Sequence, residues 1–492
     1  MEFNTSGILS TPANIRPNAR PRQCARRRRG AVPTLLATAL LAVPLAGCDS
    51  DPEVGHRLNQ AGDLVKTVLG FETGDAAQAN VLDTRYLGSI AADDTQVVDL
   101  GRRTLLGGGS AADAASVMAL ALTVTQPGRA GLAGGGACLV KPPGGGAVEE
   151  LDFPAQKAEG GTLPVPGLMR GLAALEARYG RLRWQQIVAP VEALATTGMT
   201  VTPNLLSDLQ AAGLGTGGPG GVPPKVGDIL PQRAVSASLA TLRTGGAAVF
   251  YTGSAGGELV EQGVPGRALA NYAPVWRAPA SVTSGTDRLY FPQNPAGAAA
   301  LASWQAVQAP AAQAAGDPAA RFAVARVAAF PAGSAGIDQP AGSTGFLATD
   351  AAGTAVTCAI GMGRLFGSGQ IIEPFGIFAA VPFDGAAAGS LVPILVTDTT
   401  GGQLRAALAG AGSYAAPADT AAIAASVLHG GRGLAELLSE PRTPAESVGT
   451  LVPDRIMALD CPSGLTAQTR ACFVQHDPRG GGFSMHVEQL AR

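Results

Sequence analysis

The segment that begins at Gly342 reads Gly342-Ser343-Thr344-Gly345-Phe346-Leu347-Ala348-Thr349-Asp350. Two hydroxyl residues, Ser343 and Thr344, open a run of strand-forming residues directly after a loop of small residues. Hydroxyl residues are common at strand starts, and this is the purely structural interpretation. The chemical interpretation is that Ser343, if it became a new N-terminus, would carry both a nucleophilic hydroxyl and a basic α-amine.

The rest of the chain offers little other catalytic machinery. It has four histidines, and none stands at the spacing of a metal-binding motif. They are His56, His429, His476 and His486. The sequence therefore predicts neither a metal site nor a cofactor, and it gives no support for a clustered Ser-His pair.

The composition indicates a globular protein. The chain has 492 residues, of which 46% are hydrophobic and 15% charged, so it can bury a large core in one large or two coupled domains. Residues 1–47 carry seven arginines and Glu2, so their removal would change the formal net charge from −2 to −8. An acidic mature chain argues against nucleic acid as a partner.

The N-terminus has the form of a targeting segment. Arg26 to Arg29 precede an apolar stretch that contains two prolines and ends in Leu45-Ala46-Gly47-Cys48. We interpret residues 1–47 as a signal peptide and residues 48–83 as a tether. A small pair before a cysteine resembles the lipobox of bacterial lipoproteins, in which Cys48 receives the lipid. We therefore expect an exported, periplasmic, membrane-anchored lipoprotein, with a plain secretory signal or cytosolic retention as alternatives.

Four other cysteines lie in the mature region. Cys461 and Cys472 are close together in a segment that contains Pro and Gly, and an oxidising compartment would favour a disulfide between them. Cys138 and Cys358 lie within apolar stretches, and we expect them to be buried thiols.

The residues before Ser343 predict mainly helices. Ser110 and Asp113 have the spacing of a capping box at the start of a buried helix that runs to about Thr123. A glycine-rich turn leads into a predicted strand over residues 137–140. Two further helices are predicted at 168–179 and 184–196, because apolar residues recur there at helical spacing.

The residues after Ser343 predict strands with helices behind them. A hairpin is expected from strands 346–349 and 354–360, joined by a turn that ends in Gly353. Further predicted strands are 371–381 and 391–397, and predicted helices are 421–428 and 435–438. Strands flanked by helices indicate a layered α+β architecture.

Ten short stretches in this order and spacing carry a family resemblance. They are Gly108-Gly109-Ser110-Ala111-Ala112-Asp113-Ala114-Ala115, Gly134-Gly135-Gly136, Leu151-Asp152-Phe153, Val165-Pro166-Gly167, Tyr179-Gly180, Ala189-Pro190, Phe250-Tyr251-Thr252-Gly253, Trp276-Arg277, Phe366-Gly367-Ser368-Gly369 and Asp477-Pro478-Arg479. Through them the chain resembles the gamma-glutamyltransferases, also called gamma-glutamyltranspeptidases or glutathione hydrolases, over nearly all of its mature region.

The resemblance implies a fold and a maturation step. Such proteins are N-terminal-nucleophile hydrolases with a four-layer αββα sandwich, made as a precursor that cuts itself into two subunits. Here the large-subunit-like region would be residues 84–342 and the small-subunit-like region residues 343–492. The family's nucleophilic Thr falls on Ser343, and Thr344 takes the second Thr position. A freed α-amine, with an ordinary pKa of about 7.7 to 8.0, would serve as the general base.

The resemblance also implies a substrate site, from which this sequence departs. The family's carboxylate-binding Arg is replaced by Pro154, and we expect Lys157 to reach inward as a partial substitute. A Thr and an Asn of the second hairpin strand fall on Gly361 and Gly363, which supply no side-chain donor.

Three further positions complete the expected substrate site. Ser390 retains one hydroxyl of the family's Ser-Ser step, and Gly412 lies in the stretch that corresponds to the Gly-Gly oxyanion loop. Asp384 is the candidate for binding the substrate ammonium.

Two functions follow from these observations. The first is a self-processing amidohydrolase or transferase that acts on a small γ-glutamyl (glutathione-like) or altered amide substrate. The alternative is a catalytically inactive family member that serves as an envelope scaffold or binding lipoprotein, in which Ser343 is only a strand residue.

Overall fold

The computed structural model describes residues 84–214, 223–310, 318–331, 340–383, 390–429, 431–443, 454–465 and 472–490. Every feature described below belongs to one compact unit, residues 82–492. The predicted signal peptide, the tether, Cys48 and Asp384 lie outside the described residues. Within those residues no helix is both long enough and apolar enough to cross a membrane.

Two antiparallel sheets form the centre of the fold. The first has seven strands in the order β17 (Phe483–Leu490), β1 (Thr84–Ala92), β9 (Ser343–Thr349), β10 (Ala355–Gly361), β2 (Gly135–Lys141), β3 (Glu149–Phe153) and β6 (Val275–Arg277). The second has six in the order β16 (Phe473–Gln475), β15 (Arg455–Asp460), β14 (Leu404–Ala411), β13 (Val392–Asp398), β8 (Asp287–Phe291) and β7 (Ala280–Ser284). Each sheet therefore combines strands from both sides of Ser343 in the sequence.

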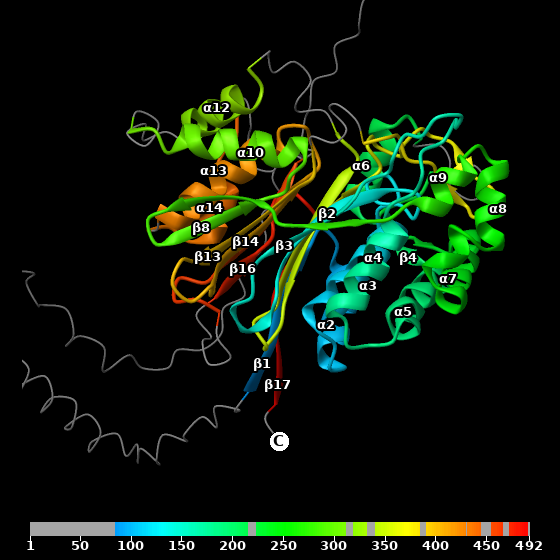
Figure 1. The fold of residues 1–492 in the computed structure, drawn as a ribbon, viewed down its shortest axis with the longest axis horizontal. Coiled ribbons are helices and arrows are strands. Elements are labelled where there is room, and N and C mark those ends of the chain that lie inside the picture. Colours follow the sequence, from blue (N-terminus) through cyan, green and yellow to red (C-terminus); the bar gives the residue numbers. More distant parts are fainter. Residues whose placement is uncertain are drawn as a thin grey trace, which may run out of the picture. The chain divides into compact units, whose positions relative to one another are not determined.

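Helices cover the outer face of each sheet (Figure 1). On the seven-stranded side are α2 (Thr95–Leu106), α3 (Ala111–Thr125), α4 (Leu168–Tyr179), α5 (Trp184–Thr197), α6 (Pro203–Ala211), α7 (Arg233–Gly245), α8 (Ser254–Glu261) and α9 (Gly266–Asn271). On the six-stranded side are α10 (Pro295–Val307), α12 (Pro318–Ala329), α13 (Ala416–His429) and α14 (Leu434–Ser439). The result is the four-layer αββα sandwich that the family resemblance implies.

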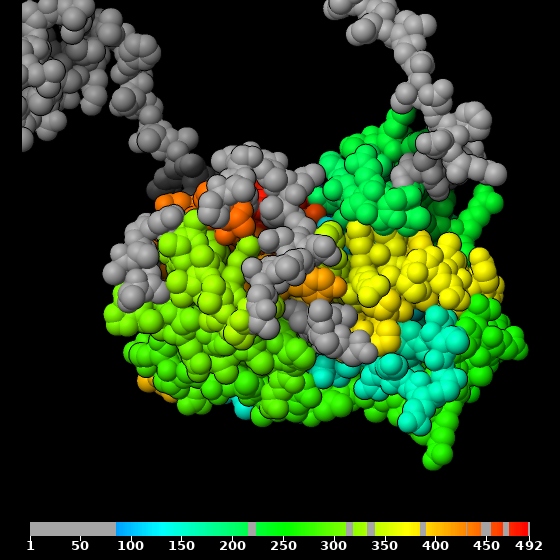
Figure 2. Space-filling view, turned by 90° about the horizontal axis from the view of Figure 1, so that it is seen from above, coloured from blue at the N-terminus to red at the C-terminus, as the bar shows by residue number. Residues whose placement is uncertain are grey.

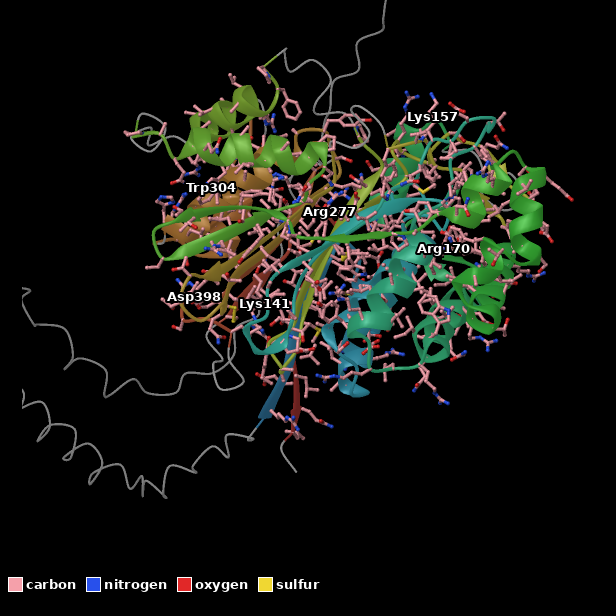
Figure 3. All side chains as sticks on the ribbon, viewed as in Figure 1. Lys141, Lys157, Arg170, Arg277, Trp304 and Asp398 are labelled. Atoms are coloured by element: carbon pink, nitrogen blue, oxygen red, sulfur yellow. A yellow bond between two sulfur atoms is a disulfide. The ribbon has the colours of Figure 1, made fainter. Side chains whose placement is uncertain are left out.

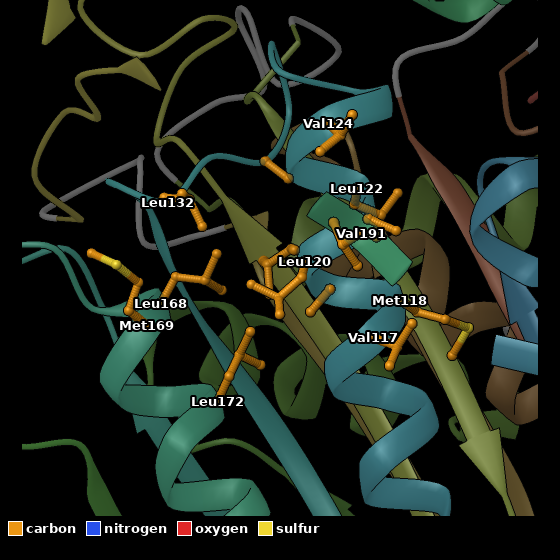
Figure 4. Close-up of a cluster of buried hydrophobic side chains, with 14 of the residues drawn as sticks. Val117, Met118, Leu120, Leu122, Val124, Leu132, Leu168, Met169, Leu172 and Val191 are labelled. Carbon is orange, nitrogen blue, oxygen red and sulfur yellow. The ribbon is translucent and has the colours of Figure 1, made fainter. Parts of the chain in front are cut away.

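Helix α3 is buried on every side, because nearly all of its residues are small or apolar. The predicted capping box is present: Asp113 N–H donates to Ser110 Oγ at 3.2 Å, and Ser110 N–H donates to Asp113 Oδ2 at 2.6 Å. Side chains of α3, α4 and α5 meet in one apolar cluster (Figure 4). This cluster supports the helix-facing side of β9 and β10.

The predicted hairpin is confirmed, since β9 and β10 pair from Thr349–Ala355 to Ser343–Gly361. The predicted strand over residues 371–381 is wrong. Within this range only Ile371–Ile372 (β11) and Ile377–Phe378 (β12) pair, as a two-residue ribbon. A separate two-residue ribbon elsewhere in the chain joins Met199–Thr200 (β4) to Ile229–Leu230 (β5). Pro374 lacks an N–H donor and Gly376 has φ +65°, so the chain turns here instead of continuing.

The cysteines form two disulfides among the described residues. Cys461 is bonded to Cys472, in line with the expectation from their spacing. The expectation of buried thiols at Cys138 and Cys358 is wrong, because these two residues are also bonded to each other. They lie directly opposite one another on β2 and β10, with their Cα atoms 4.1 Å apart.

The carboxyl group of Glu176 makes stability depend on pH. It faces Ser116 and Asp113 of α3, and burial together with the charge of Asp113 raises its pKa from 4.5 to about 9. The folded protein therefore keeps a proton that the unfolded chain releases, so this contribution is complete below pH 4.5 and is lost as the pH rises to about 9. We expect Glu176→Gln to raise the melting temperature at pH 8 but hardly at pH 5.

Thermal unfolding at both pH values measures this effect. Glu258→Gln, a change at an exposed helical glutamate, is the matched control and should leave the pH dependence unaltered. The same pH slope for Glu176→Gln and the parent protein would contradict the prediction.

Candidate active site

Ser343 is the first residue of β9 and lies at one end of the space between the two sheets. It pairs with Gly361 of β10, which pairs in turn with Gly135 of β2. The side chain of Ser343 is 1% exposed and faces the six-stranded sheet, as do the residues two and four positions further along β9. The hydroxyl is thus held between the sheets and away from the helices.

A backbone amide is aimed at the Ser343 hydroxyl. Gly412, directly after β14, donates its N–H to Ser343 Oγ at 2.8 Å, and its own carbonyl accepts from Ala341 N–H at 2.8 Å. Gly412 has φ +113°, which a residue with a side chain rarely adopts. The expected oxyanion stretch therefore does reach Ser343, through Gly412.

The carbonyl before Ser343 is also held by an amide. Met362 N–H donates to the Gly342 carbonyl oxygen at 2.8 Å, just beyond the end of β10. Gly342 has φ +61°, and a Cβ there would lie 2.0 Å from the Arg364 carbonyl oxygen. Only glycine fits this position without a shift of the backbone.

Arg129 is a buried cation beside the same residue, and sequence reasoning missed it. Its Nη1 donates to the Ser343 carbonyl oxygen at 3.5 Å, while Nε and Nη2 bind both oxygens of Asp208 on α6 at 2.6 and 2.7 Å. Burial opposes its charge, but Asp208 together with Asp93 and Asp454 raises the pKa of Arg129, so it stays charged. The sequence feature that could have pointed to Arg129 is its position as an isolated arginine between two glycine-containing turns.

The other predicted site residues that the structure describes make no contact with the Ser343 hydroxyl that compares with that of Gly412. Thr344 points to the opposite face of β9, where its buried Oγ1 has no hydrogen-bond partner among the described residues. Ser390 is buried and directly precedes Leu391, which packs beside the site. The expectation that Lys157 reaches inward is wrong, because its side chain is exposed (Figure 3). A long, strongly hydrated ammonium gains more from water than from an apolar wall.

Apolar side chains occupy the space above the two glycines of the hairpin. A Cβ on Gly361 would lie 3.1 Å from Ser343 Cβ and 3.4 Å from Leu391 Cδ2. A Cβ on Gly363 would lie 2.5 Å from Val381 Cγ2 and 3.4 Å from a ring atom of Phe383. The side chains of Leu391, Val381 and Phe383 beside these glycines are apolar, and the polar atoms there are backbone oxygens, those of Gly342 and Val381, each 3.0 Å from such a Cβ.

The geometry suits attack by a hydroxyl on a neighbouring carbonyl. One N–H contacts the hydroxyl oxygen and another polarises the carbonyl of the preceding peptide, and both belong to backbone that strand pairing fixes. Such donors stabilise the negative charge that develops on an oxygen during acyl transfer.

Comparisons with known proteins identify the class and then a similarity to one family. The fold is similar to that of a cephalosporin acylase from Bacillus halodurans, with a TM-score of 0.64 and 17% identity over 82% of this chain and 96% of that one. This defines the protein as having the N-terminal-nucleophile hydrolase fold. Residues 98–320 match the family model of gamma-glutamyltranspeptidase. This part of the chain is therefore similar to the gamma-glutamyltransferase family, whose members are hydrolases and transferases.

Two human relatives illustrate the extent of the likeness. Glutathione hydrolase 5 proenzyme is 33% identical over 248 residues, which are 43% of this chain and 42% of that protein. Glutathione hydrolase 7 is 31% identical over 193 residues, 34% of this chain and 28% of that protein. The matches thus span less than half the length of either relative.

Proposed function

We propose that this protein is an amidohydrolase or transferase that cuts its own chain before Ser343 and then uses Ser343 as the nucleophile. The observation that carries the proposal is the pair of backbone amides, Gly412 N–H on the Ser343 hydroxyl and Met362 N–H on the Gly342 carbonyl. The substrate would be a small amide, either γ-glutamyl, as the names of the relatives suggest, or with an altered acyl group.

Self-cleavage would proceed by an acyl shift. Ser343 Oγ attacks the Gly342 carbonyl carbon, the bond from that carbon to Ser343 N breaks, and the hydroxyl proton ends on the released amine. Met362 N–H stabilises the oxyanion on the Gly342 oxygen during this step. Water then hydrolyses the ester, which leaves a carboxylate on Gly342 and a free hydroxyl and α-amine on Ser343.

The same groups would then act on the substrate. The α-amine of Ser343 takes the proton from Oγ as Oγ attacks the amide carbonyl, and it passes that proton to the departing amine. The resulting acyl ester is resolved by water, which gives an acid, or by a second amine, which gives a new amide. Gly412 N–H, which contacts Oγ in the uncut chain, lies close enough to stabilise the substrate oxyanion.

A denaturing gel of the full-length protein tests the proposal. After reduction we expect two fragments, with the smaller one beginning at Ser343 by N-terminal sequencing. Ser343→Ala should give a single chain, because the methyl group cannot attack the carbonyl, whereas Ser368→Ala, remote on the loop after β10, should still be cut. A single intact chain for the parent protein would contradict self-cleavage, and a fragment that begins at Thr344 would move the nucleophile by one residue.

The same gel without reductant should give a different result. The disulfide between Cys138 and Cys358 joins the part of the chain before Ser343 to the part after it. The cut protein should therefore run as one species until a reductant is added. Two fragments in the unreduced lane would show that this disulfide is absent, while leaving the cleavage itself intact.

The inactive alternative has its own supporting observation. Pro154, Gly361 and Gly363 provide no polar side chain where the family binds its substrate, and Ser343 is almost completely buried. A scaffold or binding lipoprotein would need only the fold. The parent protein remaining uncut in the gel would favour this second function.

We further propose export and lipid attachment at Cys48. The support is the basic, then apolar, then Leu-Ala-Gly-Cys order of the first 48 residues. Mass spectrometry of the mature protein from membranes tests it, with acylated Cys48 as the expected new N-terminus and an unmodified chain as the contradictory result.

A further inference from the structure

A cavity of about 160 Å³ lies between the two sheets, at the end where Ser343 lies. Its apolar wall consists of Pro154, Pro295, Phe383 and Leu391. The segment after β3 (cyan), the segment after β10 (yellow) and the helices α10 and α12 (light green) are all visible on one face of the molecule (Figure 2). The cavity is lined by residues from both sides of Ser343 in the sequence.

Leu391, which lines the cavity, is the residue that links it to the candidate nucleophile. Ser343, Gly361 and Gly135 stand side by side on β9, β10 and β2, and a Cβ on Gly135 would lie 2.7 Å from the Pro154 carbonyl carbon. Ser343, Gly361 and Gly135 face the six-stranded sheet and span two strand spacings, about 9.5 Å. Leu391 Cδ2 and Ser343 Cβ both lie within 3.4 Å of the place where a Gly361 Cβ would be. The floor between hydroxyl and cavity thus has no polar side chain.

The polar side chains at the rim are occupied by the protein itself. Asn294 Oδ1 accepts from Gly297 N–H at 2.8 Å and so caps α10, and Gln293 Nε2 donates to the Ala278 carbonyl at 2.6 Å. Asp152 Oδ2 accepts from Arg277 Nη2 at 2.8 Å. None of these interactions requires a ligand.

The charge at the rim disfavours an anionic substrate. Arg277, labelled in Figure 3, is held by two carboxylates, since its Nη2 also donates to Glu150 Oε1 at 2.6 Å. One cation between two carboxylates leaves a negative excess beside the cavity. A substrate carboxylate would be repelled there and would lose its hydration against the apolar wall.

We propose that the substrate of this site is an amide of an uncharged, apolar acyl group, whose hydrocarbon chain fills the cavity between Pro154, Phe383 and Leu391. This rests on the proposed function of Ser343. A second, more open hollow of about 380 Å³ shares Gln293, Asn294 and Pro295 and adds Leu301 and Ala298, which extends the apolar surface outward. Binding sites for small molecules are mostly apolar with a few polar groups, and here the polar groups lie at the reacting end.

A series of p-nitroanilides tests the proposal on the self-cut protein. We expect kcat/KM to rise from acetyl through butanoyl to hexanoyl anilide, because each methylene in an apolar pocket is worth roughly tenfold. The hexanoyl compound should exceed L-γ-glutamyl-p-nitroanilide by at least about tenfold. A flat series, a preference for the γ-glutamyl compound, or hydrolysis of neither by the cut protein would overturn the proposal.

Two substitutions sharpen the test. Phe383→Ala should lower kcat/KM for the hexanoyl anilide by about tenfold or more. Pro154→Arg should lower the ratio of kcat/KM for the hexanoyl anilide to kcat/KM for the γ-glutamyl anilide by about tenfold or more. Pro223→Arg, the same change at an exposed position, should leave both the hexanoyl kcat/KM and this ratio unchanged. Formation of the Ser343 fragment shows that each variant has folded. An uncut parent protein would overturn the proposed function as a whole, whereas a cut protein with the wrong preference overturns only the apolar substrate.

Discussion

Replacing Gly342 by alanine should slow self-cleavage by about 100-fold or more, the range found when one oxyanion donor is lost from an enzyme. A Cβ at this position would lie 2.0 Å from the Arg364 carbonyl oxygen, so the backbone must move. The left-handed conformation, φ +61°, would cost alanine a further 1–2 kcal/mol, roughly. Either shift takes the Gly342 carbonyl away from Met362 N–H and from the angle at which Ser343 Oγ can attack.

The measurement is the fraction of cut chain in reduced samples taken at intervals after synthesis. Gly353→Ala is the matched control. It also has a positive φ, +81°, but a Cβ there meets nothing within 4 Å, and the residue lies in the turn at the far end of β9 and β10. Gly353→Ala should be cut at the parent rate. Equal rates for Gly342→Ala and the parent would mean that this carbonyl is not the one attacked.

Much of the fold could be predicted because local signals and the tertiary structure agree. The Ser110–Asp113 capping box, the helix over 168–179 and the hairpin after Ser343 each have a periodicity or a turn that matches their final environment. Gly412, which the resemblance assigns to the oxyanion stretch, contacts Ser343 Oγ, and its role there stays a prediction.

The residues that could not be predicted act over long sequence distances. Cys138 and Cys358 look like isolated apolar cysteines until β2 and β10 are paired, and only the register places them opposite each other. Lys157 was assigned inward by analogy with a missing arginine, but nothing in its local sequence specifies which way its side chain points. Leu391 and Phe383 fill the space over Gly361 and Gly363 only because the second sheet brings them there.

The same reasoning applies to Arg129, and it leads to the largest expected effect on stability. Arg129, with its side chain 3% exposed, neutralises Asp208 at 4% exposure and lies near Asp93, which is itself paired with Arg455 of β15. Arg129→Leu would leave the Asp208 carboxylate buried without its partner. Breaking a buried pair in this way costs about 3–5 kcal/mol. We expect that loss in the free energy of unfolding, measured by urea denaturation in the uncut Ser343→Ala background.

Two further variants separate the charge from the packing. Arg102→Leu removes an arginine from a partly exposed pair with Asp99, whose side chains are 35% and 38% exposed, and should cost at most about 1 kcal/mol. Arg129→Leu combined with Asp208→Leu removes both buried charges and should recover most of the lost stability, because the cost comes from the unpaired carboxylate and not from the missing contact. If the double variant were no more stable than Arg129→Leu alone, the guanidinium would act through its shape and through its bond to the Ser343 carbonyl. In that case the double variant should also fail to cut itself when Ser343 is restored, whereas a purely electrostatic role for Arg129 predicts that it cuts normally.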